Sequence, residues 1–172
     1  MIKSLFKVLF YTVLFVLIQV LIMDNIHLFR IASPFLYLFV IVKVPINISR
    51  SYVIAISFLL GMIIDVFSNT LGMHAAACTL IGIIRKPLIF TFSMKELEED
   101  ATPSYRSLGV PAYMKYVIVL VIIHHFSLFF IESASLFDPI LLFFRIFANV
   151  ILTASFIFII EAFFLKHRKN ET

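Results

Sequence analysis

The chain has 172 residues, of which 62% are hydrophobic and only 14% are charged, whereas a soluble domain carries about 45–50% apolar and 25% charged residues. This composition excludes a soluble globular domain. The net charge of +4 does not indicate nucleic-acid binding, because the basic residues lie beside apolar runs, as topogenic signals do. The single cysteine, Cys78, excludes an intrachain disulfide, a CxxC redox pair and a thiolate zinc site.

Apolar segments recur along the whole chain and predict an all-α integral membrane protein with a bundle of about six transmembrane helices. The expected helices cover residues 5–23, 34–48, 52–67, 71–92, 113–131 and 140–164. Lys3 and Lys7 form a basic region at the start of the first segment, and no small-residue cleavage site follows it, so we expect it to remain as a membrane helix. Lys43 and Pro45 interrupt the second segment, which predicts a short or re-entrant helix there.

One polar loop, residues 93–112, separates the fourth and fifth expected helices, and it is too short to form a domain core. We therefore expect a single membrane domain over residues 1–172, with this loop in the cytoplasm. If the N-terminus is cytoplasmic and six spans alternate, Arg30 lies outside and Arg145 lies within the last helix. The other 12 of the 14 basic residues, Arg85 included, then lie on the cytoplasmic side or at its edge. This distribution predicts that both termini are cytoplasmic and that the turn at 68–70 is outside.

Charged residues inside a membrane helix are costly, at least ~2.5–3.5 kcal/mol each on insertion scales, and each calls for a reason. Asp65, His74, Glu132 and Arg145 all fall near the predicted outer surface. Asp65 is expected to cap the turn or the next helix, and His74 to be a packing residue. We expect Arg145 to form an ion pair with Asp65 or Glu132 rather than a substrate site. Glu161 is expected at the inner interface.

Small residues indicate that the third and fourth helices pack closely. Gly61, Asp65 and Ser68 share one helix face, and Gly72 and Gly82 each belong to a small-xxx-small pair of the fourth helix. Both of these glycines are expected where helix backbones nearly touch. No catalytic or cofactor site is predicted, because enzyme motifs are lacking. No metal site is predicted either, because the adjacent residues His124 and His125 point about 100° apart on a helix and cannot easily share one ion.

The stretch from Gly61 to Ala75 reads G-M-I-I-D-V-F-S-N-T-L-G-M-H-A. It resembles the signature G-x-x-x-D-x-F-S-x-T-x-G-x-H-A of the bacterial rod shape-determining protein MreD family. The chain length, a glutamine late in the first helix (Gln19) and a proline opening the second segment (Pro34) agree with that family, and the segment that starts at Pro34 resembles the version in Bacteroidetes.

The resemblance implies a fold similar to the substrate-binding subunits of energy-coupling-factor vitamin transporters, no catalytic activity and no cofactor. It implies a multi-pass protein of the bacterial inner membrane within the elongasome, the complex that organises lateral peptidoglycan synthesis and cell shape. The implied partner is an MreC-like bitopic membrane protein, with other elongasome components and a second copy of this chain as further candidates. The alternative from another class is a transport subunit that binds a small molecule in an outward pocket near Asp65, His74 and Arg145.

Overall fold

The structure is a computed structural model that describes residues 2–23, 33–93, 97–98, 100–133 and 138–169, with side chains described from residue 10 to residue 164. These residues form seven α-helices and no strand. The helices are α1 (Ile2–Leu21), α2 (Leu38–Val42), α3 (Arg50–Ser68), α4 (Met73–Phe92), α5 (Tyr105–Leu108), α6 (Val110–Glu132) and α7 (Pro139–Lys169).

Four helices, α3, α4, α6 and α7, are long and apolar enough to cross a membrane. The part of α1 with described side chains, Phe10–Leu21, is an apolar helix of shorter length. Large apolar side chains cover the outside of the bundle: Val66, Phe143 and Phe163, for example, are 75%, 67% and 70% exposed. Such a surface suits lipid rather than water, and the chain is therefore all-helical with the character of a multi-pass membrane protein.

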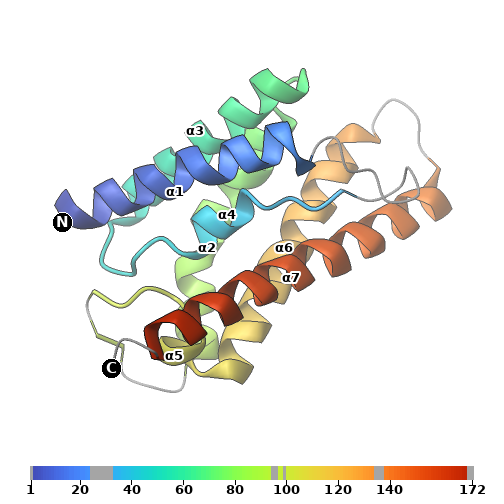
Figure 1. The fold of residues 1–172 in the computed structure, drawn as a ribbon. Helices are drawn as coiled ribbons and strands as arrows, with labels where there is room; N and C mark the ends of the chain where they lie inside the picture. The colour runs from blue at the N-terminus through green and yellow to red at the C-terminus, as the bar shows by residue number, and fades with distance from the viewer. Residues whose placement is uncertain (1, 24–32, 94–96, 99, 134–137, 170–172) are drawn as a thin grey trace.

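The long helices follow one another around the bundle. α3 and α4 form an antiparallel hairpin, α4 packs on α6, α6 packs on α7, and α1 lies against α3 (Figure 1). α1 begins and α7 ends toward the same end of the bundle, and the α3–α4 turn lies toward the opposite end (Figure 1). The ring of Tyr11 on α1 contacts Phe164 on α7 at 6.1 Å between centroids, which brings the first and last helices together.

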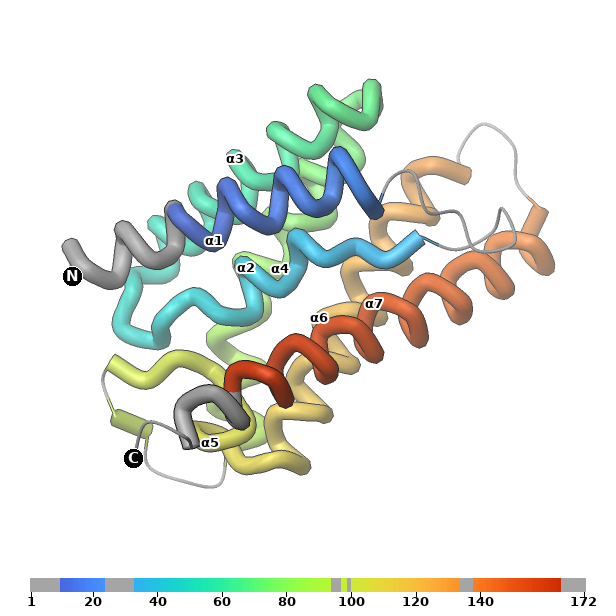
Figure 2. The backbone as a smooth tube through the Cα atoms, in the orientation of Figure 1, coloured from blue at the N-terminus to red at the C-terminus, as the bar shows by residue number. Residues whose placement is uncertain are grey.

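The second apolar segment is short, as expected, but it is not a helix over 34–48. Only Leu38–Val42 is helical, and all five residues are buried. Pro45 explains the end of α2, because proline cannot donate a helical hydrogen bond. The segment threads between α1 and α7 as an irregular stretch, one helical turn and a second stretch of turns and bends (Figure 2). It contacts α7 at Asn149 through Ser33 and at Glu161 through Lys43, about 18 Å apart along that helix.

Side chains of other helices satisfy the extended backbone of this segment. The amide of Ser33 donates to Asn149 Oδ1 at 2.9 Å, that of Phe35 to Thr153 Oγ1 at 3.0 Å, and that of Leu36 to Gln19 Oε1 at 2.8 Å. The carbonyl of Val42 accepts from the Tyr116 hydroxyl at 3.3 Å, and that of Val44 accepts from the Arg85 guanidinium. Non-helical backbone at membrane depth is tolerated only inside protein, where such partners exist.

Two charged residues are buried inside the bundle. The Arg85 side chain is 1% exposed, and its guanidinium donates to the Val44 carbonyl. Glu161 is also buried, and it binds Lys43 Nζ at 2.9 Å and the Tyr113 hydroxyl at 3.3 Å.

The polar loop is shorter than predicted, because α6 begins at Val110, with Pro111 in its first turn. Gly109, at φ 81°, joins α6 to the short helix α5, which lies within the expected loop. The loop also packs against the second segment: the amide of Ile46 donates to the Ala101 carbonyl at 3.0 Å, and Lys43 donates to the Pro103 carbonyl at 2.8 Å. Residues 94–96 and 99 of the loop lie outside the described part of the chain.

Candidate functional site

The α3–α4 hairpin closes without space between its backbones. A Cβ atom at Gly61 would lie 2.5 Å from both the Ala75 Cα and the His74 carbonyl oxygen. At the next level down the hairpin, a Cβ at Gly82 would lie 2.7 Å from Ser57 Oγ and 3.3 Å from the Ile54 Cα. The small-residue contact predicted at Gly82 is therefore present, and Gly61 forms a second one nearer the turn.

Asp65 closes the hairpin from within. Its carboxylate accepts hydrogen bonds from the main-chain amides of His74 at 3.1 Å and Ala75 at 2.8 Å and from the Thr70 hydroxyl. The two amides belong to the first turn of α4, whose N–H groups have no partner inside the helix, and a carboxylate there also meets the positive end of the helix dipole. Asp65 thus caps α4 from the preceding helix, the role expected from the sequence.

The turn itself depends on left-handed backbone. Asn69 and Gly72 have φ values of 53° and 78°. No atom lies within 4 Å of the position that a Cβ at Gly72 would take, apart from its chain neighbours. The expectation that Gly72 lies at a close backbone contact was therefore wrong, and the glycine is there because its conformation disfavours other residues.

His74 belongs to a buried cluster of aromatic and imidazole rings. Its Nδ1 lies 2.7 Å from the Tyr37 hydroxyl, which lies 3.1 Å from His124 Nε2. The Phe35 ring stacks on the imidazole of His125 at 5.1 Å, and His125 Nε2 lies 3.3 Å from Thr153 Oγ1. Tyr37 and Phe35, which come from the threaded segment, were missed because their sequence neighbours predict only a hydrophobic helix.

Arg145 pairs with one of the two acids that the sequence allowed. Its Nη2 lies 3.0 Å from Glu132 Oε1 and 3.3 Å from Oε2, and its guanidinium lies 4.8 Å from the centroid of the Phe129 ring. In the described part of the chain, Asp65 makes its contacts within the hairpin instead, so the alternative pairing of Arg145 with Asp65 was wrong. The side chains of Arg145 and Glu132 are 35% and 38% exposed.

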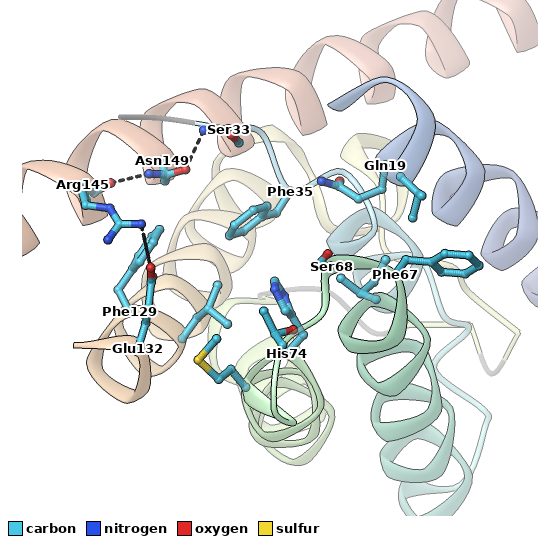
Figure 3. Close-up of a pocket in the computed structure, with 15 residues that line it drawn as sticks. Gln19, Ser33, Phe35, Phe67, Ser68, His74, Phe129, Glu132, Arg145 and Asn149 are labelled. Carbon is cyan, nitrogen blue, oxygen red and sulfur yellow. Dashed lines mark hydrogen bonds and ion pairs between the residues drawn. The ribbon is translucent and has the colours of Figure 1, made fainter. Parts of the chain in front are cut away.

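A pocket of about 560 Å³ opens at this end of the bundle (Figure 3). Every long helix contributes to its lining, as does the threaded segment. Ser68, His74, Glu132 and Arg145 lie around it (Figure 3), and Thr70 also belongs to its lining. Asp65 is not among the lining residues. The sequence placed these side chains at one level, and the structure gathers all of them except Asp65 around one pocket.

The volume of this pocket falls within the range of about 300–1,000 Å³ that small-molecule sites occupy. Among the described residues, no group of three or more His, Cys, Asp or Glu side chains is placed to hold a metal ion. Comparisons with family models, curated proteins and solved structures found no match to this chain.

Proposed function

We propose that this chain is a non-enzymatic membrane scaffold of the MreD type, which binds an MreC-like bitopic protein in the complex for lateral peptidoglycan synthesis. One observation supports the proposal most. The residues of the 61–75 stretch that carry the family resemblance are used by the hairpin itself. Gly61 permits the backbone contact, Asp65 caps α4, Thr70 binds Asp65, Gly72 allows the turn, and His74 binds Tyr37.

A motif used in this way builds a rigid hairpin rather than a catalytic centre. The hairpin then presents an apolar outer face that includes Leu59, Val66 and Phe67, which are 56%, 75% and 61% exposed. In lipid, a partner helix associates with such a face through packing and hydrogen bonds rather than through the hydrophobic effect. A rigid face loses little conformational entropy when it is bound.

The proposal includes the arrangement in the bacterial inner membrane. The segment 33–48 counts as one of six crossings, both termini lie in the cytoplasm, and the α3–α4 turn lies outside. The fold is then of the type found in the substrate-binding subunits of energy-coupling-factor transporters. The common end of α1 and α7, and the passage of 33–46 from the level of Asn149 to that of Glu161, support this arrangement.

The pocket supports a second candidate, a transport subunit that binds a small molecule near His74, Glu132 and Arg145. Copurification of the MreC-like partner distinguishes the two. Under the scaffold proposal, Asp65→Ala loosens the hairpin and loses the partner, whereas Asp138→Ala, which removes an exposed cap of α7, retains it at matched protein level. Full copurification with Asp65→Ala, together with normal cell shape, contradicts the scaffold proposal. If the chain is instead a transport subunit, Arg145→Gln abolishes binding of the small molecule and leaves copurification of the partner unchanged.

A further inference from the structure

The pocket at the α3–α4 turn combines a cation, an anion and apolar walls. Arg145 and Glu132 lie at its edge, and Val20, Ile64 and Leu128 are among the apolar residues of its lining. Since the two charges are opposite and adjacent, a simple anion that approaches Arg145 is repelled by Glu132. A simple cation that approaches Glu132 is likewise repelled by Arg145. A ligand that carries both charges next to each other matches both residues.

The ion pair leaves donors and acceptors for such a ligand. Both hydrogen bonds of the guanidinium to Glu132 come from Nη2. In the described part of the chain, Nε and Nη1 of Arg145 make no hydrogen bond, and a guanidinium has five N–H donors in all. The guanidinium carbon lies 4.8 Å from the centroid of the Phe129 ring, a cation–π contact that favours this position of the group. Both side chains are more than a third exposed, which keeps them accessible from the pocket mouth.

We propose that this pocket binds a zwitterion that carries a primary ammonium group beside a phosphate or carboxylate group. Arg145 binds the anionic group, and Glu132 accepts hydrogen bonds from the ammonium. Two sources supply this chemistry: the headgroup of an aminophospholipid, whose glycerol and upper chains lie against the apolar lining, and a free zwitterion such as an amino acid. The inference requires only that the bundle lies in a membrane. It can therefore fail while the partner proposal holds, and the partner proposal can fail while this inference holds.

A thermal melt of the purified protein tests this inference, because Cys78 is the only cysteine and is fully buried. A thiol-reactive fluorophore therefore reports unfolding directly. The probes are dihexanoyl phosphatidylethanolamine, phosphatidylcholine and phosphatidylglycerol, together with O-phosphoethanolamine and glycine as free zwitterions. At about ten times the dissociation constant, a specific ligand raises the midpoint by roughly 3–6 °C.

A shift with phosphatidylethanolamine alone identifies the lipid source, and a shift of the same size with O-phosphoethanolamine or glycine identifies a free zwitterion. Equal shifts with all three lipids, or no shift with any probe, overturn the inference, because choline has no N–H donor for Glu132 and glycerol carries no cation. In Arg145→Gln the shift disappears. In Glu132→Gln the preference for ethanolamine over choline disappears. Arg106 is an exposed arginine of α5, so the control variant Arg106→Gln keeps both the shift and the preference.

Competition between phosphatidylethanolamine and phosphatidylcholine on the wild-type protein, read by native mass spectrometry, needs no variant. It keeps the inference testable if Arg145→Gln does not fold. Retention of ethanolamine lipid in at least tenfold preference is expected, and equal retention overturns the inference.

Discussion

The carboxylate of Asp65 binds the main-chain amide of Ala75, ten residues further along the chain, at 2.8 Å. One side chain therefore joins the end of α3 to the start of α4 and holds the turn between them. The same contact keeps Asp65 away from Arg145, and it leaves Glu132 as the partner of that cation.

Asp65→Ala should lower the free energy of unfolding by about 2–3 kcal/mol, because it leaves two amides and the Thr70 hydroxyl without their acceptor. Asp65→Asn should cost nearly as much, since its NH₂ group must face one of the N–H donors. Asp138→Ala removes a similar but exposed cap and should cost about 1 kcal/mol or less. Thermal melts followed through Cys78 compare the three variants, and equal midpoints for Asp65→Ala and Asp138→Ala would contradict the assigned role.

Substitution of the glycines should separate packing from backbone conformation. Gly61→Ala meets backbone atoms of α4 and should cost more than about 3 kcal/mol. Gly72→Ala meets no atom but must adopt a left-handed conformation, which costs about 1–2 kcal/mol.

The cost of Gly82→Ala should lie between the costs of these two variants. Adding Ser57→Gly should reduce that cost, because the nearest atoms to the added Cβ belong to the Ser57 side chain. The yield of monodisperse protein in detergent ranks the variants. If Gly72→Ala proves worse than Gly61→Ala, the hairpin does not close as described.

Thr153→Val should destabilise the bundle by about 1–3 kcal/mol, because the Phe35 amide and His125 Nε2 both lose their contact with its hydroxyl. Thr153→Ser keeps the hydroxyl and should behave close to wild type. Thr91→Val is a matched control, because that exposed hydroxyl bonds only a carbonyl of its own helix; it should cost less than about 0.5 kcal/mol. Melting midpoints measure the difference. Equal midpoints for Thr153→Val and Thr91→Val would contradict a stabilising role of the Thr153 hydroxyl.

Lys43 and Glu161 form a buried pair, with side chains 17% and 3% exposed. Lys43→Met alone or Glu161→Gln alone should cost about 3–5 kcal/mol, because the remaining charge has lost its partner. The double variant should be more stable than either single one. The exposed pair of Arg145 and Glu132 should contribute only about 0–1 kcal/mol. A double-mutant cycle on each pair measures both coupling energies, and a larger coupling at the exposed pair would reverse the assignment.

Cysteine labelling in whole cells tests the orientation. In a Cys78→Ala background, Leu71→Cys at the exposed α3–α4 turn should react with an impermeant maleimide, because the turn is expected outside. Arg106→Cys, exposed at the opposite end on α5, should react only after the membrane is permeabilised. The reverse pattern would invert the topology.

The sequence predicted the long helices well, because apolar runs of about 20 residues allow few other structures in a membrane. It also placed Asp65 as a cap and brought Glu132 and Arg145 to one level. The path of residues 33–46 could not be predicted. Gln19 looks like an isolated polar residue on an apolar helix, and Asn149 and Thr153 look like a stripe that continues from Arg145. Only the folded bundle brings them beside the amides of one distant segment.

Gly72 and Arg85 illustrate two further limits. Glycine is required both at close contacts and at left-handed turns, and spacing alone does not distinguish the two. The position of Arg85 near the end of an apolar run indicates a membrane edge, but it does not reveal that the guanidinium is buried and donates to the Val44 carbonyl. For Gly72 the backbone conformation of the turn is decisive, whereas for Arg85 the hydrogen-bond partner belongs to a part of the chain that is not adjacent in sequence.

The threaded segment also determines when the bundle can be completed during synthesis. The amides of Ser33 and Phe35 have acceptors on α7, and these are 116 and 118 residues later in the chain. Until α7 has entered the membrane, those amides lack their partners, and such groups are costly in hydrocarbon. The helices α3, α4 and α6 can pack against one another as they are made. Residues 33–46 can reach their final position only after the last helix has been translated. The order of assembly along this chain is therefore not the order of its synthesis.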